Sequence, residues 1–112
     1  MRAPAERITQ FSKQEIDRLF QTSTCQFKNN AVTLLTAPRS REFARMLLVV
    51  PKAAGIAVVR NKLRRRLKDI FRREALSQKL PVDLVVIARK PIMDYSFDEL
   101  KKLINKIVQK VS

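Results

Sequence analysis

The sequence contains no histidine and a single cysteine, Cys25, among its 112 residues. Histidine is the commonest general base and a frequent metal ligand, so its absence excludes every catalytic pair or metal site that depends on it. One cysteine cannot form an internal disulfide, and alone it makes no zinc site. We therefore interpret Cys25 as a reduced thiol without a chemical role.

Glycine and long apolar segments are also scarce. Gly55 is the only glycine, which excludes a glycine-rich phosphate-binding loop. The longest apolar runs, residues 46–51 and 84–88, have the length of strands and are too short to cross a bilayer. Residues 1–7 have no apolar region behind them and do not resemble a secretory signal. We expect a cytoplasmic protein that does not enter a membrane.

Acidic residues are few and scattered. Two-metal hydrolysis of nucleic acid needs clustered carboxylates, so this distribution argues against a nuclease whose catalytic site is made of protein. The chain has 24 Lys and Arg against 10 Asp and Glu, a net charge of +14. Such an excess in a folded domain predicts a polyanionic partner. The length and the apolar content of 46% suit one domain, residues 1–112, in which we expect residues 1–8 to be flexible.

The hydrophobic pattern predicts the order helix, strands, basic helix, strand, helix. Ser12 with Glu15 and Ser96 with Glu99 have the spacing of capping boxes, which mark two helix starts. The expected elements are a helix over 12–22, a short strand over 25–28, strands over 31–37 and 44–50, a helix over 58–77, a strand over 82–88 and a helix from 97 onward. This order indicates a small α+β domain in which helices cover one sheet.

The predicted helix near residue 60 has one apolar stripe and is otherwise strongly cationic. The stripe consists of Val59, Leu63, Leu67, Ile70 and Phe71, and residues 60–73 contain eight Lys or Arg and one Asp. Like charges three or four residues apart destabilise a helix by roughly 0.2–0.5 kcal/mol per pair, so a face that is merely solvated would mix signs. A phosphate backbone removes this repulsion and releases counterions. An anionic lipid surface is an alternative, but the flanking strands should bury the apolar stripe.

Residues 51–68, PKAAGIAVVRNKLRRRLK, resemble the signature of the bacterial ribonuclease P protein family. In that family a Lys and a Gly-x-Ala-Val segment lead into an Arg-Asn-Arg helix. Phe20 and residues 87–91 match further family positions, and the resemblance extends over about residues 8–110. It implies an α-β-β-β-α-β-α sandwich, a ribosomal-protein-like domain with a left-handed βαβ crossover.

The resemblance also implies a function. The family is the protein subunit of ribonuclease P, an endoribonuclease that removes the 5′ leader from precursor tRNA. Its RNA subunit performs the hydrolysis with bound Mg²⁺, so the resemblance implies no catalytic residue, metal ligand or cofactor in the protein. The expected partners are the catalytic RNA and precursor tRNA, with one protein per RNA subunit.

Two sets of site residues follow from the resemblance. The residues expected to bind the catalytic RNA are Lys52, Arg60, Asn61, Lys62, Arg64, Arg65, Arg66 and Lys68. Those expected in the cleft for the leader are Ile16, Phe20, Lys52, Arg89 and Lys90.

This chain departs from the family pattern at several positions. Lys62 replaces the second Arg of the triplet, which keeps the charge but loses the forked contact. Ile56 stands where Asn is usual, Ile16 where an aromatic residue is common, and the strand over 31–37 has no aromatic residue. We therefore expect the cleft to stack fewer bases. Phe20 is either a stacking platform or part of the core.

Two other classes of protein would share the charge. A structural ribosomal protein would lack the pattern of residues 52–68 and the leader cleft. A DNA-binding module that inserts its helix into the major groove needs a packed helix and a tight turn before it, whereas strands precede the basic helix here.

Overall fold

The computed structural model describes residues 9–111, so the expected flexibility of residues 1–8 lies outside the described part of the chain. The elements are α1 (Lys13–Thr22), β1 (Thr24–Lys28), β2 (Val32–Pro38), β3 (Met46–Val49), η2 (Lys52–Ala54), α2 (Ala57–Arg73), α3 (Leu76–Lys79), β4 (Val82–Ala88), η3 (Lys90–Asp94) and α4 (Phe97–Val111). The predicted order of helices and strands is confirmed, and α3 and the two 3₁₀ turns are additional.

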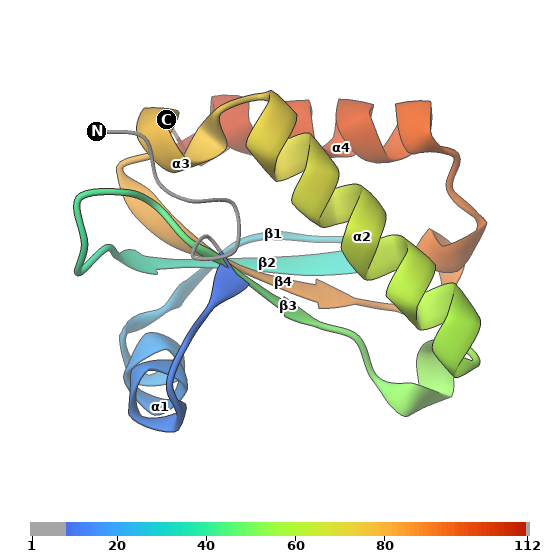
Figure 1. Cartoon of the computed structure of the whole chain (residues 1–112), viewed down its shortest axis with the longest axis horizontal. Helices are drawn as coiled ribbons and strands as arrows, with labels where there is room; N and C mark the ends of the chain where they lie inside the picture. The colour runs from blue at the N-terminus through green and yellow to red at the C-terminus, as the bar shows by residue number, and fades with distance from the viewer. Residues whose placement is uncertain (1–8, 112) are drawn as a thin grey trace.

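The four strands form one sheet in the order β1-β2-β4-β3. β2 pairs antiparallel with both β1 and β4, whereas β3 runs parallel to β4 with Met46 opposite Leu84. The connection from β3 to β4 passes through α2 on one face of the sheet (Figure 1). With β3 nearest the viewer and β4 behind it, this crossover is left-handed, against the usual preference for parallel connections.

The two faces of the sheet are covered unequally. α2 and α4 lie together on one face, and α1 lies on the other (Figure 1). The alternating residues Leu34 of β2 and Val86 of β4 join the stripe of α2 in the main core, where Leu63, Leu67, Ile70 and Phe71 are all buried. On the opposite face a smaller buried cluster, within the described part of the chain, consists of Leu19, Ala37 and Val85. That face therefore stays partly open to solvent.

The boundaries of two elements differ from the sequence-based expectation. The strand predicted over 44–50 pairs only over Met46–Val49. The basic helix ends at Arg73 rather than near residue 77, because Ala75 adopts a left-handed conformation with φ 51° and a new turn starts at Leu76.

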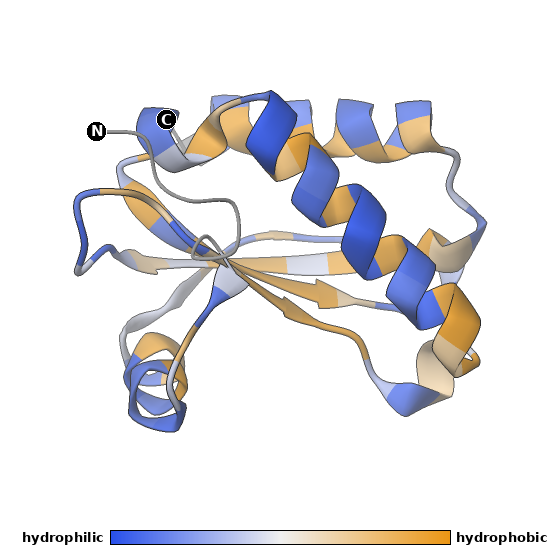
Figure 2. Ribbon diagram, viewed as in Figure 1, coloured by the Kyte–Doolittle hydropathy of each residue, from blue (hydrophilic) through white to orange (hydrophobic). Residues whose placement is uncertain are grey.

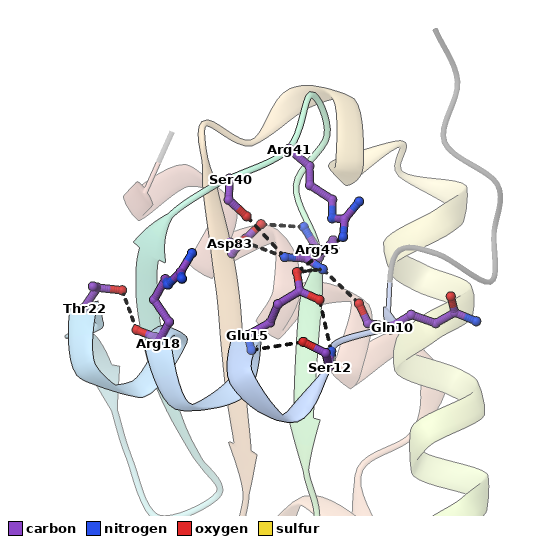
Figure 3. Close-up of polar contacts among 9 residues, drawn as sticks. All are labelled: Gln10, Ser12, Glu15, Arg18, Thr22, Ser40, Arg41, Arg45 and Asp83. Atoms are coloured by element: carbon purple, nitrogen blue, oxygen red, sulfur yellow. Dashed lines mark hydrogen bonds and ion pairs between the residues drawn. The ribbon is translucent and has the colours of Figure 1, made fainter.

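Arg45 connects the segment before α1, α1 itself and the sheet (Figure 3). Its side chain is 4% exposed, and Nη1 lies 2.7 Å from Oε2 of Glu15 and donates to the carbonyl of Gln10 at 3.0 Å. Its backbone N–H donates to Oδ1 of Asp83 at 2.8 Å. The guanidinium also lies 4.2 Å from the centre of the Phe11 ring. This residue thereby fixes the N-terminal turn of α1 against the sheet.

The two carboxylates near Arg45 titrate in opposite directions. Hydrogen bonding to the Ser12 backbone, together with the interaction with Arg45, lowers the pKa of Glu15 to about 2. Burial raises the pKa of Asp83, and the favourable contacts with Arg45 do not offset that burial. Glu15 therefore stabilises the fold fully above pH about 4.5, and this contribution disappears as the pH falls towards 2.

Changing Glu15→Gln should lower the free energy of unfolding at neutral pH by about 1–3 kcal/mol, because the nearly buried Arg45 loses its closest anion. The partial exposure of Glu15 to solvent keeps this loss below that of a fully buried ion pair. It should also flatten the loss of stability between pH 4.5 and 2, measured by urea unfolding. The ionisation of Asp83 disfavours the fold as the pH rises, and that dependence should remain.

Glu99→Gln is the matched control. Glu99 occupies the same position of a capping box, with Ser96, but makes no ion pair among the described residues. Equal losses of stability in the two variants would contradict the anchoring role of Arg45.

Candidate nucleic-acid interface

The basic face of α2 points away from the sheet. Leu63, Leu67, Ile70 and Phe71 are buried against the core, and this fixes the remaining surface of the helix outward. Figure 2 shows hydrophilic segments along the outer side of α2 above the hydrophobic strands. Val59, the first residue of the predicted stripe, is only half-buried.

Most cations of this helix have no acidic partner. Arg72 and Arg73 both pair with Asp69, at 2.7 and 3.0 Å. Within residues 9–111, no ion pair forms at Arg60, Lys62, Arg64, Arg65, Arg66 or Lys68. The first three turns of α2 therefore present positive charge that the described residues do not neutralise.

Two of these arginines are held by main-chain carbonyls. Nε of Arg60 donates to the carbonyl of Gly55 at 3.1 Å, and Nη1 of Arg66 donates to the carbonyl of Tyr95 at 3.4 Å. Both are half-buried, as is Lys68, whereas the remaining polar residues of the predicted set on α2 are exposed: Asn61, Lys62, Arg64 and Arg65. The helix thus combines oriented guanidinium groups with free, exposed cations.

A second group of cations lies where β3 and β4 end. η2, which contains the exposed Lys52, packs against η3, which begins at Lys90. A hollow of about 230 Å³ lies between the two segments, lined in part by Ile87, Arg89 and Lys90. Nη2 of Arg89 donates to the hydroxyl of Thr33 at 3.1 Å, which directs this side chain across the open face of the sheet. The structure therefore places Lys52, Arg89 and Lys90 in one region.

The α1 residues of the predicted cleft have different environments. Leu19 is buried against the sheet, Ile16 is half-buried, and Phe20 is 42% exposed. Phe20 is therefore not a core residue, and that alternative is wrong. α1 lies at one end of the open face and η2 at the other, so the predicted cleft residues form two groups rather than one contiguous set (Figure 1).

Arg45 and Asp83 are structurally central, but sequence reasoning assigned them no role. Both stand inside segments that the hydrophobic pattern predicted as buried strands. A charged residue in such a segment needs a buried partner of opposite charge. One cation and one anion in two predicted buried strands could therefore have indicated that Arg45 and Asp83 interact. Between residues 9 and 111 no three Cys, Asp or Glu residues are grouped so that they could hold a metal ion. No helix in this range is long and apolar enough to span a membrane.

Comparisons with known proteins agree with this geometry. The Ribonuclease P family model matches residues 5–112. The ribonuclease P protein component of Bacillus velezensis is 32% identical over 99 residues, which cover 88% of this chain and 84% of that protein. The corresponding protein of Roseiflexus castenholzii is 35% identical over 78 residues, or 69% of this chain and 64% of that protein.

Solved structures show the same fold. The RNase P protein of Staphylococcus aureus superposes with a TM-score of 0.77 at 23% identity, covering 94% of this chain and 98% of the other. That of Thermotoga maritima gives 0.78 at 23% identity, covering 93% and 97%. The fold, with its α2 crossover, is that of the solved RNase P proteins, and the family model matches nearly the whole sequence. This chain therefore belongs to the ribonuclease P protein family.

Proposed function

We propose that this chain is the protein subunit of a ribonuclease P ribonucleoprotein, in which it binds the catalytic RNA and helps to hold precursor tRNA during removal of the 5′ leader. The observation that carries the proposal is the cationic face of α2, where six Lys and Arg residues lack an acidic partner among the described residues. Burial of the opposite stripe holds that face outward. Such a surface fits the closely spaced phosphates of a folded RNA.

The contacts with the catalytic RNA involve Lys52 and the α2 residues Arg60, Asn61, Lys62, Arg64, Arg65, Arg66 and Lys68. Arginine forks suit paired phosphate oxygens, whereas Lys62 supplies a point charge. The main-chain hydrogen bonds of Arg60 and Arg66 support this role, because they orient the two guanidinium groups before RNA binds.

The leader of precursor tRNA binds to the open face of the sheet. α1, which carries Ile16 and Phe20, lies at one end of that face (Figure 1). At the other end η2, with Lys52, packs against η3, which begins at Lys90 directly after Arg89. A single strand held this way would use the exposed Phe20 ring for stacking and the cations for its phosphates. The half-buried side chains of Leu35, Leu47 and Ile87 supply an apolar floor between the two ends.

The RNA subunit supplies the chemistry, with Mg²⁺ held by RNA phosphates rather than by this chain. The protein contributes positive charge that allows two polyanions to approach each other. One protein binds each RNA subunit, and the complex acts in the cytoplasm.

The triple change Lys62→Ala, Arg64→Ala and Arg65→Ala should weaken binding to the RNA subunit by roughly ten-fold or more at low salt, because three exposed cations are lost. The plot of log affinity against log salt should become flatter by about 2–3, at roughly 0.7–0.9 for each of the three lost phosphate contacts. Filter binding over a salt series, alongside cleavage of precursor tRNA by the reconstituted complex, measures both effects.

The matched control removes three exposed lysines from other helices, Lys13, Lys79 and Lys102. Net charge falls equally, so a general electrostatic effect would move both triple variants together. The proposal predicts a much larger change for the α2 variant. Equal salt slopes for the two variants would mean that α2 is not the RNA-binding surface.

Phe20→Ala should weaken binding of precursor tRNA that carries a leader by about 1–3 kcal/mol, because one base loses its stacking partner. Binding of mature tRNA should not change, and thermal stability should fall little because the ring is exposed. Phe20→Tyr, which keeps a ring, is the control. A Phe20→Ala variant that holds leader-bearing and mature tRNA with wild-type affinity would show that charge alone holds the leader.

A further inference from the structure

A large groove lies between α2 and the first turn of α4, on the face of the molecule away from the open side of the sheet. Its volume is about 630 Å³, within the range typical of sites for small molecules. α4 contributes Phe97, and α2 lines the rest of the groove with Lys62, Arg65, Arg66, Lys68, Asp69 and Arg72. The groove thus combines one aromatic ring with a row of cations.

The walls of the groove are held by specific contacts. Phe97 is the first residue of α4, directly after Ser96, and the reciprocal hydrogen bonds of Ser96 and Glu99, at 3.0 and 3.2 Å, fix that helix start. Arg66 ties α2 to the carbonyl of Tyr95 just before it. The guanidinium of Arg73 lies 5.8 Å from the centre of the Phe97 ring. The ring and the cations therefore keep a defined relation without any ligand.

The charges within the groove restrict what it can hold. Lys62 and Arg65 are exposed and make no ion pair among the described residues, so they are available to an anion. Asp69 also lines the groove and pairs with Arg72 and Arg73, so its carboxylate disfavours a second anionic group placed beside it. A ligand with one anionic group for Lys62 and Arg65 and a flat, uncharged group against Phe97 fits this arrangement.

We propose that this groove binds a single unpaired nucleotide of the RNA subunit, with its base against Phe97 and its phosphate on Lys62 and Arg65. Aromatic stacking combined with basic contacts is the usual way in which proteins take up an extruded base. The carboxylate of Asp69 can accept one further hydrogen bond from an amino group of the base. This inference rests on the proposed function and adds a base-binding site to an interface that otherwise contacts only phosphates.

Phe97→Leu tests the site because it keeps most of the apolar volume and removes the ring. Affinity for the RNA subunit should fall by at least about five-fold, the lower end of a lost stacking contact. The salt slope should not change, since no charge is lost. Phe97→Tyr should restore wild-type affinity.

Phe27→Leu is the matched control. Phe27 is also half-buried against the main core and has two cations, Lys106 and Lys110, 5.5 and 5.4 Å from its ring centre, but it lies on β1 away from the groove. Thermal unfolding of both Leu variants separates loss of binding from loss of fold. Equal effects of the two substitutions on RNA affinity would overturn the proposal.

Ultraviolet crosslinking of the wild-type chain to the RNA subunit tests the site without any substitution. The expected result is one nucleotide attached to Phe97, identified by mass spectrometry. Crosslinks confined to other residues would reject the nucleotide as the occupant of the groove. A Phe97→Leu variant with unchanged RNA affinity but altered self-association would also reject it, and would indicate a second copy of the chain as the occupant. If instead the wild-type chain binds the RNA subunit without salt dependence, the proposed function itself fails.

Discussion

The contact of Arg45 with Glu15 is the interaction on which the arrangement of the open face depends. α1 buries only Leu19 fully, so apolar packing alone holds this helix weakly against the sheet. The 2.7 Å ion pair, reinforced by the backbone bond to Asp83, supplies the missing constraint. A nearly buried arginine is costly unless its partners are in place, so the same network that anchors α1 also disfavours alternative positions of the helix. The position of Phe20 relative to the sheet follows from that anchor.

The left-handed crossover has a comparable consequence on the other face. It carries α2 across the sheet with its apolar stripe facing the core, and every cation between Arg60 and Lys68 is left outside the core. The like charges destabilise the helix locally, and burial of Leu63, Leu67, Ile70 and Phe71 offsets that repulsion at roughly 1.5–3 kcal/mol per side chain. The fold therefore maintains a concentrated positive surface that an isolated peptide of the same sequence would not hold in a helix.

Much of this organisation could be predicted from the sequence, because it depends on local signals. Both capping boxes, the stripe of α2 and the strands carried their own residue patterns. The capping boxes are confirmed, the stripe is buried except at Val59, and the strands are confirmed, although the one predicted over 44–50 is shorter. The left-handed crossover followed only from the family resemblance. The role of Arg45 and the groove at Phe97 could not be predicted, since the ion pair joins Arg45 to Glu15 and the groove brings Phe97 to residues of α2, in each case residues far apart in the chain. Phe20 shows the same limit: the sequence left open whether its ring stacks on a base or joins the core, and in the structure Leu19 is the fully buried residue of α1.

We propose above that the cationic face of α2 binds one particular RNA. Crosslinking the chain to RNA in the cells that produce it, followed by sequencing of the attached RNA, tests this claim most directly. Strong enrichment of the ribonuclease P RNA, together with precursor tRNAs that still carry their leaders, is the expected result. Enrichment of ribosomal RNA instead, with no ribonuclease P RNA above background, would contradict it.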